Sequence, residues 1–454
     1  MKNFSSVYSR RQGLKPPELY EYFLDNYWFE AAGLENETIN EPLRGTHKAD
    51  VVIIGGGFTG LSSAYNIHRR FPNKKILLLE GACCGYGASG RNGGFCVATS
   101  LLDESCTDPD ARKRCLDVSL YGIEQIKECI ADHGLECDFE ANGMLDVALN
   151  EAQVDAMQQQ YRNLKEWGFD VEVLHGKDLE QEIRSPRFLA GLKTSQGATL
   201  NPAKLARGMK KIVEGMGVEI RERSVVTRVA PGRVHRVDTE LGEVEAPILV
   251  LATNAYSHKI GFFKNRLYPV YTYLVATEPV SQSQWDAIGW QNRQGLSDFR
   301  TMFNYSVRSS DGRIVMGGSD VKYYDDDGLA PGNNKSVTQA IVQDLVATFP
   351  SLAGIGIEHA WGGPMGLSLS FSPSVGVMGE HDNLYYGVGF IEGVPSTQTG
   401  GRMIADLMAG ERNEFTTHTI INRKIPYAGP RFLRAYAGAV KKWFMVNYGK
   451  INSG

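Results

Sequence analysis

The chain has 454 residues, of which 42% are hydrophobic and 22% charged, a composition typical of a globular protein with two or three domains. Its 48 basic and 52 acidic residues give a net charge of −4, which argues against nucleic-acid binding. The most apolar window, residues 51–61, is too short to span a membrane. The seven cysteines lack paired CxxC spacing, and no residue spacing indicates a metal site, so we predict a cytoplasmic protein without metal.

Residues 1–48 are predicted to form an N-terminal extension with a short helix in its aromatic part. From residue 49 the pattern becomes regular. Residues 49–54 and 75–80 are apolar runs typical of strands, and residues 59–70 have helical periodicity. Together they predict a βαβ unit, whose parallel strands are buried on both faces.

A glycine pattern joins the first strand to the first helix. Gly55, Gly57 and Gly60 form GxGxxG, which between a strand and a helix indicates a dinucleotide site. Phosphates would meet the free N–H groups at the helix N-terminus. Glu80, at the end of the second strand, would accept hydrogen bonds from the ribose hydroxyls and repel the 2′-phosphate of NADP. A tight turn beside a solvated acid is the alternative.

The stretch "CCGYGASGRNGGF", residues 83–95, has five glycines within residues 85–94. A nicotinamide site needs no such track, whereas the ribityl chain and ring of FAD need the backbone close at several successive points. Ser89 and Asn92 would add short polar groups and Arg91 a fixed charge. The pattern favours FAD over NAD, with a glycine-rich surface loop as the alternative.

Elements of two kinds alternate along the rest of the chain. Helices are predicted at 109–132, 151–167, 202–217, 335–349 and 396–410, and antiparallel strands at 268–277 and 313–318. The fold class is therefore α/β (α+β overall), a Rossmann-like domain interleaved with a domain built on a mixed or antiparallel sheet. The predicted ranges are 49–108, 195–258 and 355–412 for the nucleotide-binding domain, 109–194 and 259–354 for the substrate domain, and 413–454 for a C-terminal extension.

Six segments give a more specific resemblance. In chain order they are "ADVVIIGGGFTGLSSAYNI", "GYGASGRNGGF", "NPAKLARGMKK", "GVEIRERSVVTRV", "VLATNAYS" and "AWGGPMGLSLSFSPSVGVMGEHDNLYYGVGF". From about residue 50 to 410 the chain resembles the D-amino acid oxidase-like flavoproteins, and most of all their gamma-glutamylputrescine oxidase branch. The resemblance implies FAD as cofactor and an amine-oxidising enzyme.

The resemblance also implies roles for single residues. Val226 would contact adenine through its main chain, Thr253 would lie near the pyrophosphate, and Gly362 and Gly363 would border the flavin. No cysteine follows Cys137, which implies non-covalent FAD. The full predicted cofactor set is Gly55, Gly57, Phe58, Thr59, Gly60, Glu80, Gly81, Gly87, Ala88, Ser89, Arg91, Asn92, Gly93, Gly94, Phe95, Val226, Thr253, Gly362, Gly363, Gly389, Glu392, Gly393 and Val394.

The segment "GVGFIEGVPSTQTGG" bears on both flavin and substrate. It predicts a helix whose N-terminus would stabilise the negative charge of reduced flavin. Amino-acid-oxidising relatives bind a carboxylate through arginines in the segments matching "WGGPMG" and "GFIEGV". Neither segment has an arginine here, and Glu392 stands where many relatives have histidine, which favours a cationic amine substrate. Glu392 turned to solvent or paired with a base is the alternative.

The predicted catalytic residues are Glu392, Trp361, Tyr305 and Tyr273. Trp361 would pack over the flavin edge, and the two tyrosines would contribute to an aromatic box for an ammonium group. Packing in the core is the alternative for all three aromatic residues.

We therefore predict an FAD-dependent amine oxidase in which the α-carbon of an amine gives a hydride to flavin N5, with O₂ as acceptor. The imine formed would hydrolyse to an aldehyde or keto product. One alternative is a dehydrogenase that passes electrons to a quinone or carrier, and another is a redox-silent, flavin-bound assembly or binding subunit. A basic amphipathic helix in residues 430–450 would pack on its own domain, a membrane surface or a partner subunit.

Overall fold

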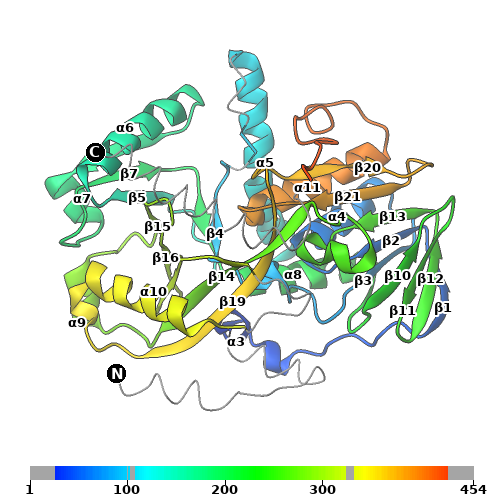
Figure 1. Ribbon diagram of the computed structural model, residues 1–454, viewed down its shortest axis with the longest axis horizontal. Helices are drawn as coiled ribbons and strands as arrows, with labels where there is room; N and C mark the ends of the chain where they lie inside the picture. The colour runs from blue at the N-terminus through cyan, green and yellow to red at the C-terminus, as the bar shows by residue number, and fades with distance from the viewer. Residues whose placement is uncertain (1–25, 100, 103–107, 324–331, 428–454) are drawn as a thin grey trace.

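The computed structural model describes residues 26–99, 101–102, 108–323 and 332–427 (Figure 1). The predicted C-terminal helix lies outside these residues, as does the first part, residues 20–25, of the predicted N-terminal helix. Two regions built on separate sheets lie side by side, one on each side of the view in Figure 1. Among the described helices, none is both long and apolar enough to cross a bilayer.

The first region is built on a six-stranded sheet. Its strands, in spatial order, are β20 (Ser374–Met378), β21 (Leu384–Val388), β13 (Ile248–Leu251), β2 (Val51–Ile54), β3 (Ile76–Leu79) and β9 (Glu219–Arg221). The five strands from β21 to β9 are parallel, and β20 is antiparallel to β21. All four residues of β2 and of β3 are buried, as the predicted βαβ unit requires.

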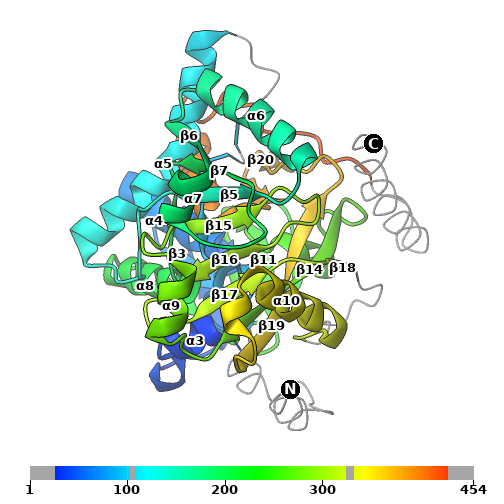
Figure 2. The same cartoon turned by 90° about the vertical axis from the view of Figure 1, so that its left-hand side faces the viewer.

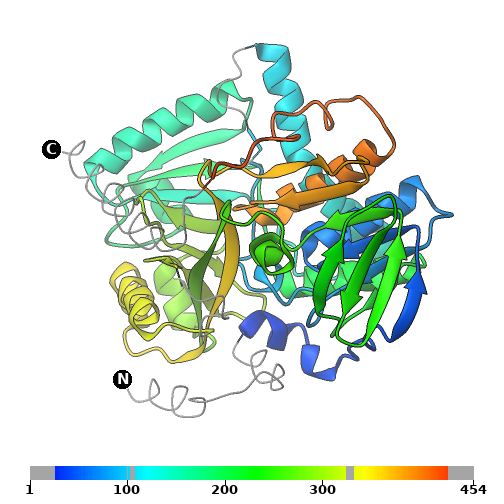
Figure 3. The ribbon, with the colours of Figure 1, turned by 45° about the vertical axis from the view of Figure 1, so that its right-hand side comes forward.

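The two faces of this sheet have different covers. Val51 and Ile53 share a core with the helices α4 (Phe58–Arg70), α5 (Pro109–His133), α8 (Pro202–Gly215) and α11 (Gly393–Met408). Val52 and Ile54 pack instead against a second, four-stranded sheet. Its order is β1 (Gly45–Lys48), β12 (Gly242–Ala246), β11 (His235–Thr239) and β10 (Val226–Ala230), and it faces the viewer at the right of Figure 3.

The second region is a mixed nine-stranded sheet. Its order is β18 (Lys322–Tyr323), β14 (Leu267–Thr277), β17 (Ile314–Gly317), β16 (Tyr305–Arg308), β15 (Gly295–Asp298), β5 (Met144–Ala148), β7 (Ala190–Thr194) and β6 (Val171–His175), with β19 (Ile357–Ser368) also paired to β14. All pairs are antiparallel except β5 with β15. Its outer helices, seen in Figure 2, are α6 (Glu151–Glu166), α7 (Gly176–Glu182), α9 (Gln282–Ile288) and α10 (Lys335–Thr348).

Short elements connect the two regions. They are α3 (Tyr27–Ala31), η1 (Leu34–Asn36), η2 (Ala88–Gly90), η3 (Asn254–Ile260), and the two-stranded pair β4 (Phe95–Cys96) with β8 (Ala198–Thr199), whereas η4 (Pro350–Leu352) packs within the second region. The fold class is the predicted one, a Rossmann-like unit interleaved with a mixed sheet.

Some segments lie in a different layer from the one that the predicted boundaries give them. β19 begins after the predicted boundary at residue 355, but it pairs with β14 along its whole length and so belongs to the large sheet. α5 follows the boundary at residue 108, yet its apolar face packs in the core of the six-stranded sheet. β1 lies within the predicted N-terminal extension and pairs with β12. Each assignment depends on pairing or packing over long sequence separations.

The contact between α5 and α11 leads to the first prediction. A β-carbon on Gly122 would overlap the carbonyl oxygen of Pro395 in the first turn of α11. We expect Gly122→Ala to lower the free energy of unfolding by about 2 kcal/mol, because this backbone contact leaves no room for a methyl group. Gly215→Ala is the control, since a β-carbon there has no atom within 4 Å, and it should leave stability unchanged or slightly higher. Urea titration measures both, and equal stability of the two variants would contradict the prediction.

Candidate active site

The predicted nucleotide turn joins β2 to α4. Gly55 has φ +108°, and its N–H donates to the Leu79 carbonyl at 2.8 Å. A β-carbon on Gly60 would overlap the Gly55 carbonyl oxygen, so strand and helix approach as closely as the fingerprint predicts. The N-cap of α4 is Gly57, which has no side chain to cap the helix. The N-terminus of α4 is therefore open to a ligand except where the Ser89 hydroxyl accepts from Phe58 N–H at 2.9 Å.

Glu80 ends the second strand beside this turn. Its carboxylate accepts hydrogen bonds from the N–H groups of Gly56, at 2.7 Å, and Ala82, at 2.9 Å. Burial raises the pKa of Glu80, and these two hydrogen bonds offset part of that effect. Cys83 and Cys84 follow, and both are buried, with thiol pKa values raised by burial. The backbone bonds fix Glu80 at the edge of the turn.

The glycine-rich track runs from this turn to the large sheet. It begins at Gly85, whose N–H donates to the Gly56 carbonyl at 2.9 Å. It ends just before β4, where a β-carbon on Gly93 would overlap the ring of Tyr305. Tyr305 also makes an edge contact with Phe95, with the ring centroids 5.7 Å apart. The track therefore joins the nucleotide turn to the face of the second sheet, as a long ligand would require.

Arg91 links the track to β19. The Arg91 guanidinium donates to the Tyr86 carbonyl at 2.7 Å and to the Gly362 carbonyl at 3.3 Å, and it lies over the Tyr86 ring. A β-carbon on Gly363 would lie 3.0 Å from the Arg91 side chain. The structure thus brings together three predicted cofactor residues, although Arg91 is only 4% exposed and donates to carbonyl groups of the chain.

A second junction joins η3, β19 and the loop before α11. The Asn254 side chain accepts from Gly389 N–H at 3.0 Å, and Gly389 has φ +80°. A β-carbon on Gly366 would lie 2.6 Å from the same amide oxygen. The neighbouring Thr253 hydroxyl shares a 2.9 Å hydrogen bond with Ser257. Asn254 was not among the predicted site residues, although the quoted segment "VLATNAYS" contains it.

The N-terminus of α11 carries the predicted substrate acid. Glu392 is the N-cap residue, but its side chain does not cap the helix. The carboxylate instead accepts from the Thr99 hydroxyl at 2.8 Å. Gly393 and Val394 open the helix, so the positive end of α11 lies beside Glu392 and is free of side-chain caps.

Five polar side chains in and around the predicted site share two properties. Surrounding protein strips enough water from each to raise its pKa, yet each still has accessible surface. Of the five, Glu392 is exposed and the other four are half-buried, so each keeps some surface that a ligand could contact. The five are Glu80, Asp146, Tyr256, Tyr305 and Glu392.

The pKa of Glu392 is affected by loss of hydration, by a hydrogen bond and by a second carboxylate. Loss of hydration raises the pKa of Glu392, the hydrogen bond from Thr99 offsets part of that effect, and the negative charge of Asp146 raises the pKa further. Asp146 accepts a hydrogen bond from Ser297, its neighbour across the parallel β5–β15 pair. Two carboxylates from different regions of the chain, Glu392 and Asp146, therefore influence each other.

The aromatic candidates divide into two groups. Tyr305 is half-buried against Gly93, and burial raises its pKa to about 12. Tyr273 is 0% exposed and Trp361 is 1% exposed, and each packs in a hydrophobic core. The structure places no surface of these two side chains where a substrate could contact it. Trp361 instead donates its indole N–H to the Arg91 carbonyl at 3.0 Å.

These residues fit FAD. β-Carbons at Gly55, Gly60 and Gly93 would overlap Ala252, Gly55 and Tyr305, so these glycines allow the close packing of strand, helix and ring that shapes the turn and the track. The N-terminus of α4 and Glu80 would hold the dinucleotide part. The far end of the track and the N-terminus of α11 would hold the flavin ring. Nearby, Val225 is 46% exposed beside Gly81 and Val226, where adenine contact is predicted.

Sequence reasoning missed the contribution of the N-terminal segment. Asn26 donates to the Gly90 carbonyl at 2.8 Å, and Trp28 donates to the Asn92 carbonyl at 2.8 Å. It also missed Asp146 and Tyr256. For Asp146 a signal existed, because an acid inside the apolar run "MLDVA" needs a partner or a function.

The fold and the site together define a flavoprotein oxidoreductase with an interleaved nucleotide-binding domain. The model of the family "DAO: FAD dependent oxidoreductase" matches residues 50–407. The chain belongs to this family of FAD-dependent oxidoreductases. It is 30% identical to gamma-glutamylputrescine oxidoreductase from Escherichia coli (strain K12) over 406 residues, which cover 88% of this chain and 91% of that protein.

Other relatives agree with this assignment. A probable oxidoreductase, OrdL, from Haemophilus influenzae is 29% identical, with 86% of this chain and 90% of that protein covered. Among solved structures, glycine oxidase from Geobacillus kaustophilus has a TM-score of 0.70 at 18% identity, with 84% of this chain and 100% of that chain covered. L-proline dehydrogenase from P. horikoshii has a TM-score of 0.69 at 18% identity, with 87% and 99% covered. The two solved structures show a shared fold.

Proposed function

We propose that the protein binds a cationic amine and, once the reacting nitrogen has lost its proton, oxidises it to an imine that hydrolyses to an aldehyde or keto product, with O₂ as the electron acceptor. The observation that carries this proposal is the position of Glu392, a carboxylate at the N-terminus of α11 within the electrostatic influence of Asp146. The sequences "WGGPMG" and "GFIEGV" provide no arginine beside it for a substrate carboxylate. The substrate named by the E. coli relative, gamma-glutamylputrescine, is an amine.

Each part of the site has a task in this proposal. FAD, when bound, supplies the chemistry by accepting a hydride equivalent from the substrate carbon at flavin N5. Glu392 attracts the cationic group, and Thr99 orients its carboxylate. Tyr305 and Phe95 form an apolar wall at the end of the track, which positions the substrate and limits water. The open N-terminus of α11 stabilises negative charge beside it.

An anaerobic amine screen tests the proposal. We expect primary amines, N-acylated diamines or secondary amines to bleach the flavin absorbance band of the purified holoenzyme, and α-amino acids without a second amine to bleach it more slowly. If no amine in the panel bleaches the flavin, the proposal fails and the alternative of a redox-silent binding subunit is supported. Bleaching by simple α-amino acids alone would refute the role given to Glu392.

The acceptor is tested on the reduced enzyme. If O₂ is the acceptor, stopped-flow mixing with oxygenated buffer should restore the oxidised flavin spectrum quickly and release H₂O₂. Slow reoxidation by oxygen together with fast reoxidation by a soluble quinone would show that the enzyme is a dehydrogenase and not an oxidase.

Non-covalent FAD and a cytoplasmic location are also proposals. The six described cysteines are free and buried, as expected in a reducing compartment. Burial raises the thiol pKa of Cys83 and Cys84 beside the nucleotide turn, which disfavours the thiolate needed for covalent attachment. Acid precipitation should therefore release all of the flavin into the supernatant.

A further inference from the structure

Three successive carbonyl groups of the glycine-rich track are held by side chains from outside it. The Gly90 carbonyl accepts from the Asn26 amide at 2.8 Å, the Arg91 carbonyl from the Trp361 indole at 3.0 Å, and the Asn92 carbonyl from the Trp28 indole at 2.8 Å. All three donor residues are buried. They come from segments far apart in the sequence: Asn26 and Trp28 lie at the start of α3, and Trp361 lies in β19.

The donors form one rigid group. The Asn26 side chain also caps α3 by accepting from Trp28 N–H at 3.0 Å. The rings of Trp28 and Trp361 make an edge contact within one hydrophobic core, with their centroids 6.4 Å apart. Phe29 packs beneath Gly90, where a β-carbon would lie 2.6 Å from its ring. A ring that is both packed and hydrogen-bonded has little freedom to turn, so each carbonyl is fixed in one direction.

Fixing a carbonyl also fixes the N–H group that follows it. In a planar trans peptide the C=O of one residue and the N–H of the next point in opposite directions. The Arg91 carbonyl, held by Trp361, therefore sets the direction of Asn92 N–H. The Asn92 carbonyl, held by Trp28, sets the direction of Gly93 N–H.

The neighbouring N–H groups all have acceptors within the chain. Gly90 N–H donates to the Gly85 carbonyl at 2.8 Å, Arg91 N–H to the Ala88 carbonyl at 3.2 Å, and Gly94 N–H to the Asn92 side chain at 2.9 Å. Among the described hydrogen bonds, those of Asn92 N–H and Gly93 N–H have no protein acceptor. Both residues are half-buried, and a half-buried N–H group takes its acceptor from a ligand or water.

We propose that Trp28 and Trp361 are positioning residues that aim the N–H groups of Asn92 and Gly93 at the flavin ring of FAD. The inference rests on the proposed placement of the cofactor along the track. It gives the N-terminal segment a role in cofactor binding, and it gives Trp361 a role through the backbone in place of direct contact with the substrate.

The test is Trp28→Phe, which keeps an aromatic ring but removes the indole N–H together with the five-membered ring that carries it. Trp290→Phe is the matched control, because Trp290 is 0% exposed and donates its indole N–H to a backbone carbonyl, that of Gln294 at 3.0 Å, in the core of the large sheet. Dissociation constants of the apoproteins for FAD and for ADP are measured by titration calorimetry, and unfolding temperatures by calorimetric scanning. ADP is the probe for the nucleotide half of the site alone.

We expect Trp28→Phe to weaken FAD binding roughly tenfold, the worth of one net buried hydrogen bond, while its affinity for ADP stays within about twofold of wild type. Trp290→Phe should lower the unfolding temperature to a similar extent and leave FAD binding unchanged. Equal FAD affinity of Trp28→Phe and wild type, or equal loss in the two variants, would overturn the proposal. A parallel loss of ADP and FAD affinity would overturn it as well, because the indole would then support the whole domain.

A second variant gives an independent reading. Asn26→Asp keeps the oxygen that caps α3 and replaces the donor to the Gly90 carbonyl, so it should also weaken FAD binding more than ADP binding. Unchanged FAD affinity in this variant as well as in Trp28→Phe would overturn the proposal. Wild-type protein that binds no FAD at all would refute the cofactor placement itself, which is a different result from any of these.

Discussion

Glu222→Gln is expected to lower the free energy of unfolding by about 3 kcal/mol, among the largest effects of any single substitution in this chain. The Glu222 carboxylate is 0% exposed. It pairs with Arg207 at 2.7 Å and with Lys210 at 3.2 Å, both on α8 and both buried. Removing one partner of a buried ion pair typically costs 3–5 kcal/mol, because the remaining charge has lost both water and counter-charge. The lower end applies, since Arg207 keeps Glu37 and Lys210 keeps Glu214.

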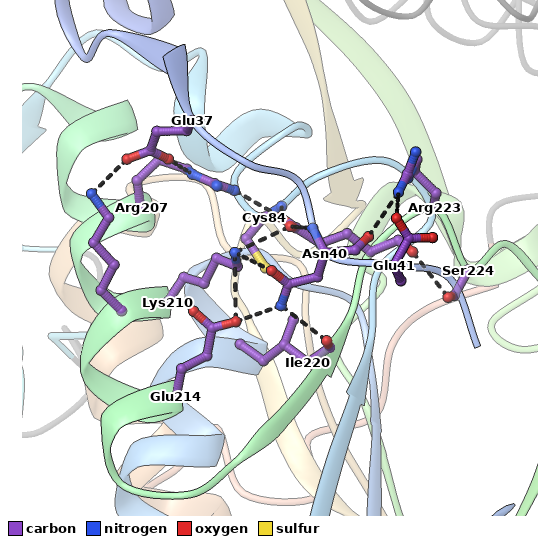
Figure 4. A network of polar contacts seen from close by, with 12 residues as sticks. Glu37, Asn40, Glu41, Cys84, Arg207, Lys210, Glu214, Ile220, Arg223 and Ser224 are labelled. Carbon is purple, nitrogen blue, oxygen red and sulfur yellow. Dashed lines mark hydrogen bonds and ion pairs between the residues drawn. The ribbon is translucent and has the colours of Figure 1, made fainter. Parts of the chain in front are cut away.

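The same carboxylate ties three parts of the chain together. It accepts the N–H groups of Cys84, at 2.7 Å, and Asn40, at 2.8 Å. Figure 4 shows the surrounding network, in which Asn40 also contacts Lys210 and Glu214. Glu222 therefore anchors the N-terminal segment and the loop after Glu80 to α8. We expect Glu222→Gln to weaken FAD binding in addition to lowering stability.

Acid titration gives the sign of the electrostatic contribution. Burial alone raises the pKa of Glu222, but Arg207, the two backbone N–H groups and Lys210 outweigh it, so the folded-state pKa lies below the ordinary value. The stabilisation is therefore complete above the unfolded pKa of about 4.3 and is lost as the pH falls through the folded pKa. Carboxyl groups ordinarily titrate between about pH 5 and pH 3. Over this range the free energy of unfolding should fall further in the wild-type protein than in Glu222→Gln.

Glu182→Gln is the control for both measurements. Glu182 lies in the other region and also accepts from a lysine, Lys193, and from two amides, but its side chain keeps 13% of its exposure. Its loss should cost less stability and leave FAD affinity unchanged. A Glu222→Gln variant as stable as Glu182→Gln, with a wild-type acid profile, would contradict the anchoring role.

Local patterns accounted for much of the nucleotide-binding half. The turn at Gly55, the helix behind it and Glu80 lie within about one βαβ unit, where strand, helix and turn signals act over a few residues. The glycine-rich track was found in the same way, because glycine is informative wherever the backbone must stay bare. These features are properties of short stretches of sequence, and the fold class follows from their order.

Features that depend on distant partners were not predictable in this way. Glu222 meets Asn40 across 182 residues, and Trp28 meets Asn92 across 64. A buried acid and a tryptophan look the same in sequence whether they hold a cofactor loop or fill a core. The pairing of β19 with β14 could not be predicted for a similar reason, since it joins segments about ninety residues apart.

Glu392→Gln is expected to raise KM for a cationic amine roughly 10- to 100-fold and to change flavin content little. A hydrogen bond to a charged group is worth about 1.5–3 kcal/mol, which corresponds to this range. Glutamine keeps an oxygen that can accept from Thr99, so the variant removes the charge and retains the hydrogen bond seen at 2.8 Å. Steady-state kinetics with a cationic amine and with an uncharged analogue measure the effect, and the analogue should show an unchanged KM.

Asp146→Asn and the double variant separate attraction from structure. Because the charge of Asp146 raises the pKa of Glu392, its removal should shift the acid limb of the KM profile for the cationic amine to lower pH. If the two carboxylates bind one cation together, the losses in the double variant will differ from the sum of the single losses. Additive losses would mean separate roles, and an unchanged KM in Glu392→Gln would remove Glu392 from substrate recognition. In that case the charge of the substrate would have to be recognised by another group, with Asp146 as the remaining candidate carboxylate.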